Sequence, residues 1–473
     1  MRRAAIAGTA LALCVTGCMM GPNYHRPETP TPKAYLYQPK ETVQPTDTDW
    51  WKGLGDPVLD QLIQEALSNN KDLMIATANV EQAAAVLTQT RSPLFPQVSY
   101  GANGTRIGFS SSLTEQVPVN VTNPTNYYSV LAGATWQIDL WGRIRRLSQA
   151  AQADLFATED ARRGVILTLI TQLTTSYVQL RALDDELVIA ERTLGVYDAQ
   201  LKLTRDKFEF GQVSQMNVAQ VESQYETVAA KIPQLRNQIV LTEMSIGVLL
   251  GRNPGDIPRG KSLQDLTPMT VPAGVPSELL ERRPDILQAE EQLVAATAQI
   301  GAAKALYFPA ISLTGQYGTG STQLHNLFET STRMWHYTGD LTGPIFTGGS
   351  ITAQVKQAKA QQQAALANYQ RVIENAFADV DQSLSTREQL LAQVAAQELL
   401  VKALTEYSEF ARLQFDAGYV PYSTVLQAEQ ELFPQELNLD EARGELLASL
   451  VSIYRAMGGA WVAGSPSGAS SAH

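Results

Sequence analysis

The chain has 473 residues, of which 47 are acidic and 36 basic, and its formal net charge at pH 7 is −11. A charge of this sign argues against nucleic acid as a partner. No segment reaches about 18 uninterrupted apolar residues, so no transmembrane helix is predicted, and the chain could cross a membrane only as a closed β-barrel.

The first residues have the pattern of a targeting signal. Arg2 and Arg3 precede an apolar, alanine-rich run at 4–15 that is too short to span a bilayer. Small residues followed by Cys18 end this run and resemble the lipobox of bacterial lipoproteins, in which the cysteine receives a diacylglyceryl group. We predict a signal peptide at 1–17 and lipidation of Cys18, with an ordinary signal peptide as the alternative.

An extended strap is predicted next, because the chain is rich in proline and threonine between 20 and 44. An amphipathic helix is expected from about 58 to 90. Pro93 and Pro96 would end this helix.

The apolar period changes from helical to alternating after this helix. Residues 127–140 are apolar at nearly every second position, with aromatic residues toward the ends. One apolar and one polar face is what a lipid-facing barrel strand needs, although a strand of a soluble sandwich shows the same alternation. A strand at 97–109 is expected to pair with it across a polar loop. This loop contains Asn120, Asn123, Pro124 and Asn126.

After Gly142, residues 143–208 contain no proline and only two glycines, which predicts one helix on the order of 100 Å long. A turn centred on Gly211 and a second helix at 214–250 would complete a helical hairpin.

The second half of the chain repeats this order of elements. The expected elements are a helix from 284 to about 304, strands at about 310–320 and 334–346, a long helix at 350–417 and a turn at Gly418. Apolar residues recur every seven positions in the long helix, which indicates coiled-coil-like packing against neighbouring helices.

The repeat is an internal duplication without gaps. A constant shift lays Arg205, Phe208, Gly211, Val213, Val218, Gln220, Glu222 and Gly251 onto Arg412, Phe415, Gly418, Val420, Val425, Gln427, Glu429 and Gly458. The assigned segments are a signal peptide at 1–17, a lipidated strap at 18–55, a first repeat at 56–251, an equatorial linker at 252–276, a second repeat at 277–458 and a flexible tail at 459–473.

Each turn is preceded by an arginine with an acidic residue four positions later. The pairs are Arg205 with Glu209 and Arg412 with Asp416. We expect tip salt bridges on solvated helix surface, each contributing roughly 0.3 to 0.5 kcal/mol.

Four strands per chain cannot close a barrel, since small barrels need about eight. Several copies must therefore contribute to one barrel. Three copies would supply twelve strands, while counting alone leaves a dimer of eight open.

Several separated motifs carry a resemblance that covers nearly the whole chain. They are Cys18 followed by Gly21-Pro22-Asn23-Tyr24 and Arg26-Pro27, Trp50-Trp51 with Asp56-Pro57, Asp139-Leu140-Trp141-Gly142-Arg143, Glu281-Arg282-Arg283-Pro284-Asp285-Ile286, Phe308-Pro309, and Pro344-Ile345-Phe346-Thr347-Gly348-Gly349. Together they resemble the outer membrane factors of the TolC superfamily. The most similar members are lipoprotein components of tripartite drug efflux pumps of the resistance-nodulation-division type.

This resemblance implies an α+β fold with an internal two-fold repeat. The expected assembly is a trimeric, twelve-stranded transmembrane β-barrel, with four strands per chain, continuous with a long periplasmic α-helical barrel. The implied location is the outer membrane of a Gram-negative bacterium, and the implied role is a passive exit duct for drugs or other toxic small molecules. The implied partners are two further copies of the chain, a periplasmic adaptor, an inner-membrane proton-driven pump and outer-membrane lipid.

The resemblance also implies sites at the two turns. The adaptor-contact candidates are Gly211, Gln212, Val213, Gly418, Tyr419, Val420 and Pro421. The family often narrows its duct with aspartates just past the turns, whereas the matching residues here are Asn217, Gln220, Thr424 and Gln427, with Glu222 and Glu429 nearby. We therefore expect a neutral, amide-rich periplasmic aperture rather than a strongly cation-selective one.

Three other functions compete with this one. An enzyme is disfavoured because His25, His325, His336 and His473 are scattered and no phosphate-binding glycine loop occurs, so no catalytic residue, metal or cofactor is predicted. A lipid-anchored coiled-coil scaffold would leave the alternating segments unexplained. Type I secretion or metal efflux would use the same duct and stays open.

Overall fold

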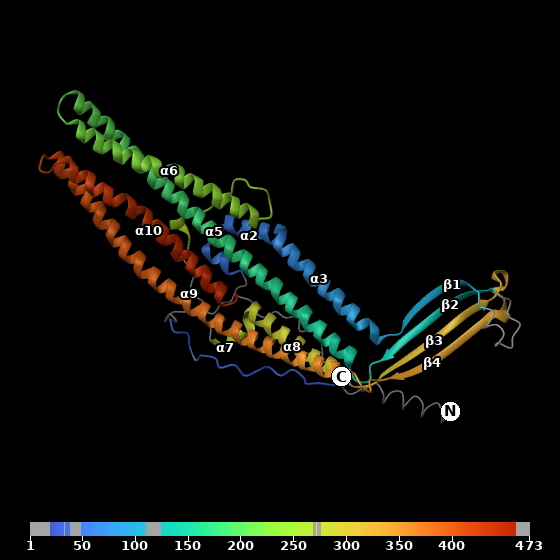
Figure 1. The fold of residues 1–473 in the computed structure, drawn as a ribbon. Coiled ribbons are helices and arrows are strands. Elements are labelled where there is room, and N and C mark those ends of the chain that lie inside the picture. Colours follow the sequence, from blue (N-terminus) through green and yellow to red (C-terminus); the bar gives the residue numbers. More distant parts are fainter. Residues whose placement is uncertain are drawn as a thin grey trace. The chain divides into compact units, whose positions relative to one another are not determined.

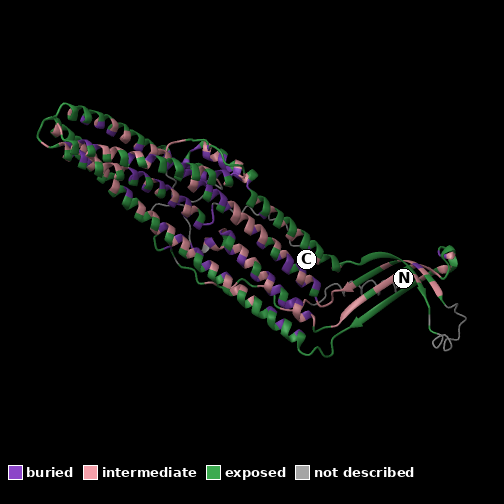
Figure 2. Cartoon of the chain, turned by 45° about the horizontal axis from the view of Figure 1, so that its top comes forward, coloured by how far each residue is buried: buried purple, intermediate pink, exposed green. Residues whose placement is uncertain are grey.

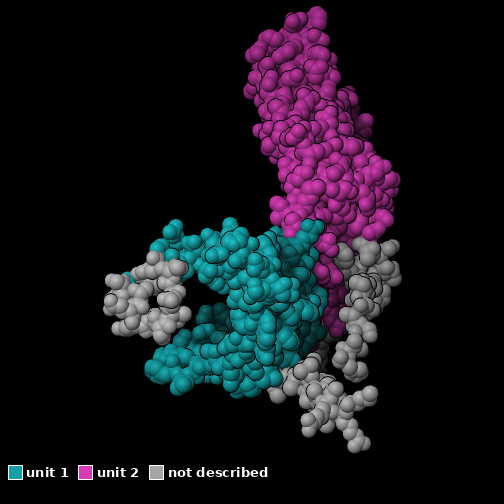
Figure 3. Space-filling view, turned by 90° about the vertical axis from the view of Figure 1, so that its right-hand side faces the viewer, with its two compact units in different colours: residues 1–28, 79–158, 289–369 teal, residues 29–78, 159–288, 370–473 magenta. Residues whose placement is uncertain are grey.

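The computed structural model describes residues 19–32, 34–37, 49–108, 110, 124–267, 271 and 276–459. The expected signal peptide, Cys18, the loop residues Asn120 and Asn123, and the tail from 460 onward lie outside the described residues. The chain divides into two compact units (Figure 3). Unit 1 comprises Met1–Glu28, Asn79–Thr158 and Ala289–Tyr369, and unit 2 comprises Thr29–Ala78, Glu159–Gln288 and Gln370–His473.

Unit 1 contains one antiparallel sheet of four strands (Figure 1). The strands are β1 (Gln97–Ile107), β2 (Thr125–Ile138), β3 (Ala310–Ser321) and β4 (Arg333–Thr342), and their order in the sheet is β1-β2-β3-β4. The strand expected to reach 346 ends at Thr342. Pro344 follows closely, and proline has no N–H with which to continue a ladder.

Long helices form the rest of the described chain. They are α2 (Pro57–Asn69), α3 (Lys71–Arg91), α5 (Arg143–Glu209), α6 (Gln215–Leu249), α7 (Pro276–Arg282), α8 (Pro284–Ala305), α9 (Ser350–Asp416) and α10 (Tyr422–Ala456), with short 3-10 helices at Trp50–Leu54, Ser92–Leu94, Leu263–Asp265, Leu324–Asn326 and Thr330–Thr332. None of the helices in the described residues combines the length and apolar character needed to span a membrane.

The single helix expected at 58–90 is instead two helices, and this expectation was wrong at Asn70. The backbone of Asn70 is extended, its Oδ1 accepts the N–H of Leu73 at the start of α3, and its Nδ2 donates to the carbonyl of Leu249 at the end of α6. One side chain thus caps two helix ends, which compensates for breaking the helix.

In unit 2, α5 with α6 and α9 with α10 form two antiparallel helical hairpins (Figure 1). Buried and exposed positions alternate along the helices (Figure 2), because each helix turns only part of its surface toward its neighbours.

The junction from sheet to helix in unit 1 explains one of the sequence motifs. The indole N–H of Trp141 donates to the carbonyl of Pro309 at 2.8 Å, and its ring stacks on Phe308 with centroids 4.5 Å apart. Asp139 accepts the N–H of Arg145 at 2.9 Å and so caps the start of α5. The junction therefore joins the two halves of the duplication within unit 1.

Candidate functional sites

One face of the sheet is predominantly apolar, although its row of Ala102 and Val130 continues into Thr319 and Arg333. Directly paired residues share a face, and the pairing places Tyr100, Ala132, Tyr317 and Trp335 in one row across the sheet. The next row on this face holds Val98, Ala134, Gly315 and Tyr337. The aromatic members are exposed, Tyr100 by 92 % and Tyr337 by 80 %, so no described residue covers this face.

The opposite face of the sheet is polar. Its rows contain Gln97, Thr135, Thr314 and Thr338, and then Ser99, Gly133, Gln316 and His336. The outer edges of β1 and β4 carry no further strand among the described residues. The sheet therefore has an apolar face, a polar face and two unpaired edges.

The two hairpin turns have the same backbone structure. Gly211 and Gly418 adopt positive φ angles of 69° and 78°. The N–H after each glycine donates five residues back, from Gln212 to the carbonyl of Lys207 and from Tyr419 to that of Gln414, both at 2.8 Å. This arrangement is a Schellman motif, for which a glycine without Cβ strain is best suited.

Large apolar side chains are exposed around both turns. Phe210 is 79 % and Tyr419 is 82 % exposed, and Met216, Phe410 and Leu413 are also more than half exposed. The remaining adaptor-contact candidates lie within the same two turns: Gly211, Gln212, Gly418 and Pro421 are exposed, and Val213 and Val420 are half-buried.

The two hairpins pack against each other just behind their turns. Leu201, Val218 and Val221 of the first hairpin form one buried cluster with Leu426 of the second. The ammonium group of Lys207 also lies 5.6 Å from the centre of the Phe415 ring. The relative position of the tips within unit 2 is therefore determined by apolar packing.

Neither expected tip salt bridge forms, so both predictions were wrong. Arg205 binds Glu222 of the opposite helix at 2.8 Å instead of Glu209. No ion pair joins Arg412 to Asp416 among the described residues. On a helix, a pair in which the arginine precedes the carboxylate by four residues is weaker than the reverse order. A carboxylate across the turn can therefore replace the one on the same helix.

The duplicated counterparts of Arg205 and Glu222 behave differently. One oxygen of Glu429, Oε2, is buried and has no hydrogen-bond partner in the described chain. Burial raises the pKa of the Glu429 carboxyl, while Arg412 nearby lowers it. The same two residue types thus form an exposed ion pair in one hairpin, whereas in the other the carboxylate has an unpartnered buried oxygen.

The predicted aperture residues follow the turns but are not bonded to one another across the hairpins in the described residues. Asn217 accepts the hydroxyl of Ser214 at 2.5 Å, and the exposed Gln427 donates to Glu431 at 3.3 Å. Gln220 and Thr424 are half-buried. The residues that face one another in a single chain are therefore Arg205 and Glu222, not the amides.

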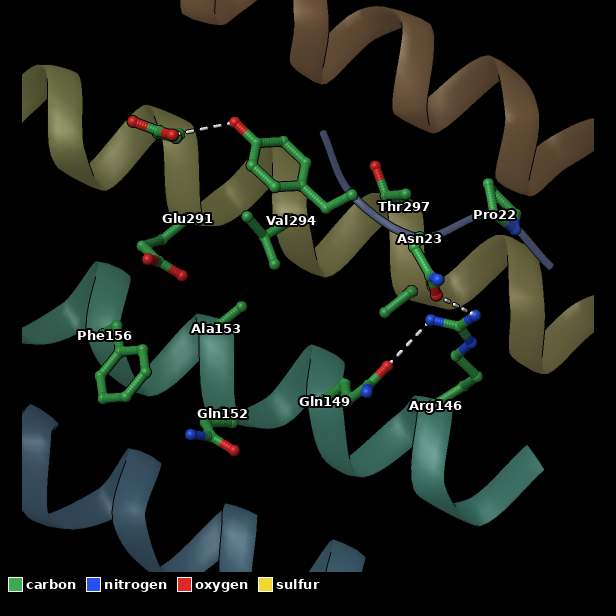
Figure 4. A pocket seen from close by; sticks show the side chains of 13 residues that line it. Pro22, Asn23, Arg146, Gln149, Gln152, Ala153, Phe156, Glu291, Val294 and Thr297 are labelled. Carbon is green, nitrogen blue, oxygen red and sulfur yellow. Dashed lines mark hydrogen bonds between the residues drawn. The ribbon is translucent and has the colours of Figure 1, made fainter. Parts of the chain in front are cut away.

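The strap after Cys18 is held firmly within unit 1. Arg146 of α5 donates from Nε to the carbonyl of Met20 at 2.9 Å and from Nη2 to Oδ1 of Asn23 at 2.9 Å. Figure 4 shows Arg146, Asn23 and Gln149 together beside a pocket of about 460 Å³. Gly21 approaches α8 so closely that a Cβ would lie 2.4 Å from the Cα of Gly301.

Arg283 was named in the sequence only as part of a motif, but its side chain is a central connection in unit 2. It is 8 % exposed and donates to Asp285, to Asp379 of α9 and to the carbonyl of Ala456 at the end of α10. An arginine directly before the proline that starts α8 was the available signal. Its partners lie 96 and 173 residues away, and nothing in the sequence indicated that they would contact Arg283.

No group of three or more histidine, cysteine or carboxylate side chains suited to a metal occurs among the described residues.

Comparison with known proteins gives consistent results. The family model described as outer membrane efflux protein matches residues 62–252 and 275–459. The chain is similar to a probable efflux pump outer membrane protein of Pseudomonas putida, TtgC, with 32 % identity over 98 % of this chain and 96 % of the relative. It is also similar to a probable outer membrane lipoprotein of Salmonella typhimurium, SilC, with 30 % identity over 95 % of this chain and 97 % of the relative.

The fold is likewise similar to that of solved structures. The open state of the MtrE outer membrane channel of Neisseria gonorrhoeae matches with a TM-score of 0.85 and 31 % identity, covering 94 % of this chain and 98 % of that one.

Proposed function

Because this chain belongs to the family of outer membrane efflux proteins, it is an outer-membrane channel of an efflux system, and we propose how its parts perform that role. Toxic small molecules delivered by an inner-membrane pump leave the cell passively through its interior. The observation that carries this proposal is the sheet with one apolar and one polar face.

Three copies of the chain form the channel. The apolar face, with Tyr100, Tyr317 and Trp335, suits contact with lipid, and the polar face suits a water-filled interior. An unpaired strand edge in lipid would expose backbone N–H and C=O groups, each at a cost of several kcal/mol, so β1 of one copy pairs with β4 of the next. Three copies close a ring of twelve strands, and the helical hairpins continue it as a helical barrel in the periplasm.

The lipid anchor is Cys18, and its acyl chains sit in the outer membrane. The segment that follows, from Met19, is held against α5 and α8 by Arg146 and Gly21. Incorporation of labelled palmitate into the wild-type protein, and its loss in Cys18→Ala, is the direct measurement.

The exposed apolar side chains at the turns bind a periplasmic adaptor. Such side chains are rarely left exposed together unless they meet a partner. Replacing both Phe210 and Tyr419 with serine should abolish efflux while the trimer still reaches the outer membrane. Leu399→Ser provides a control, because Leu399 is 70 % exposed on α9 but lies away from the turns.

Deletion and complementation test the function as a whole. A strain without the gene should accumulate organic solvents or antibiotics, and the wild-type gene should restore their export while the double serine variant should not. Rescue by the double variant would exclude the turns as the adaptor site. A deletion strain sensitive only to metal ions would assign the channel to metal efflux instead.

A further inference from the structure

A second pocket, separate from the turns and the sheet, lies in unit 2 between α5, α6 and α10. Its volume is about 560 Å³. Ala182 and Gly444 bring α5 and α10 close together at one wall, where a Cβ on Gly444 would lie 3.1 Å from that of Ala182. Leu183 and Leu241 supply aliphatic surface to the same pocket.

The side chain of Glu186 lines this pocket and has no bonding partner. It is only 9 % exposed, and neither a hydrogen bond nor an ion pair within 4 Å joins it to any described residue. A largely buried carboxylate that no protein donor satisfies has only the water in the pocket as its partner, which is less favourable than full hydration. The protein therefore maintains an acceptor here that its own donors do not satisfy.

The charges around Glu186 come from two other helices. Lys231 of α6 attracts the carboxylate, whereas Glu441 and Asp440 of α10 repel it, and Glu445 of α10 also lines the pocket. Burial raises the pKa of Glu186 to about 7, with Lys231 opposing the shift and the two acidic neighbours adding to it. The pocket thus holds three glutamates and one lysine.

We propose that this pocket binds organic cations, specifically primary amines on a short aliphatic chain, with Glu186 as the buried counter-ion. An ammonium group would donate charge-assisted hydrogen bonds to the carboxylate, and the aliphatic walls would contact the chain. Thr175, Gln179 and Gln238 line the pocket and offer further acceptors. A bare metal ion fits less well, because the described residues hold no ligand cluster and the pocket is far larger than an ion.

Titration with putrescine tests this site in the purified, assembled full-length protein in detergent. Calorimetry at pH 8 should detect saturable binding. At pH 6 binding should be on the order of tenfold weaker, because Glu186 with its pKa of about 7 is then mostly protonated while the amine stays charged. The uncharged analogue 1,4-butanediol should not bind at either pH.

Three variants separate this pocket from the general acidity of the chain. Glu186→Gln should weaken putrescine binding at pH 8 by roughly tenfold or more and abolish the difference between pH 6 and pH 8. Lys231→Met should strengthen binding, because it removes a competing ammonium group. Glu226→Gln removes the same charge as Glu186→Gln from an exposed position on α6 and should change nothing.

Absence of binding to wild-type protein at pH 8 would overturn the proposal. Equal losses in Glu186→Gln and Glu226→Gln would also overturn it, since they would indicate attraction to a diffuse negative surface. Helix content and thermal midpoints of the variants show that each is folded. Conduction is not measured, so a negative result would leave the proposed channel function unaffected.

Discussion

At the scale of single residues, a side chain that the sequence shows only as a helix cap can also make polar contacts far along the chain. Asp56 is 1 % exposed and accepts from the hydroxyl of Tyr177 at 2.8 Å, from the N–H of Lys261 at 3.0 Å and from the N–H of Val58 at 2.9 Å. The sequence predicted the start of a helix here, which the bond to Val58 explains. Tyr177, 121 residues away, could not be identified because a tyrosine on a helix is usually part of the core.

Tyr177→Phe should destabilise the protein by about 1 to 3 kcal/mol, because the N–H of Gly260, which donates to the Tyr177 hydroxyl at 2.9 Å, would lose its partner. Urea unfolding followed by helix content is the measurement. Tyr35→Phe is the matched control: its hydroxyl is equally buried but has no partner in the described chain, so its removal should be neutral or stabilising. Equal effects of the two variants would contradict a specific role for the network.

The partly buried carboxyl group of Glu429 is expected to make the stability of the protein depend on pH. Its folded-state pKa is raised by burial, so the folded state binds the proton more tightly than the unfolded state, and stability is lost as pH rises above the ordinary value of about 4.3. Glu429→Gln should therefore gain thermal stability relative to wild type at pH 8 more than at pH 4. Glu222→Gln, which removes the partner of Arg205, should show no such gain.

At the scale of elements, the alternation of apolar and polar residues and the positions of helix-breaking residues predicted most of the fold. The strands were visible because every second residue is apolar, and the long helices because proline is absent over more than sixty residues, as in α9 (67 residues). The break at Asn70 was missed because its cause is the carbonyl of Leu249, far along the chain. The tip ion pairs were wrongly predicted because spacing along one helix does not show the rest of the hairpin. Arg205 binds Glu222 across the turn, and no ion pair joins Arg412 to Asp416 among the described residues.

The two faces of the sheet should respond differently to charge. Tyr317→Lys places a cation on the apolar face, and we expect a loss of about 2 to 4 kcal/mol in membrane stability if it lies near the bilayer midplane. Gln316→Lys places the same charge on the polar face and should be tolerated. Heat-modifiable gel migration and the yield of detergent-resistant trimers measure both variants, and an inverse ranking would show that the faces had been assigned the wrong way round.

At the scale of the whole molecule, the duplication gives each chain two turns of equal backbone structure and unequal side chains. A trimer would present six turns, three of each kind, so that their side chains would repeat with three-fold symmetry. The aperture residues are expected to meet only in that assembly, so contacts within one chain carried no information about which amides line it.

Gln427→Asp should increase the preference of the assembled channel for cations and make its conductance sensitive to added divalent cations, because three carboxylates would replace three neutral amides. Single-channel recording in planar bilayers measures both properties. Wild-type selectivity in this variant would place Gln427 away from the narrowest point.

The contacts that hold the start of the strap against unit 1 affect how deeply the protein is inserted in the membrane. Only Met19 separates Cys18 from Met20, whose N–H donates to the carbonyl of Trp141 at 3.2 Å. Two residues of extended chain reach no more than about 7 Å. Acyl chains on Cys18 would therefore hold Trp141 at the level of the inner leaflet of the outer membrane. A glycine-serine spacer inserted after Cys18 should leave the anchor intact but allow the depth of the sheet in the bilayer to vary. Quenching of indole fluorescence by probes attached to lipids should then change.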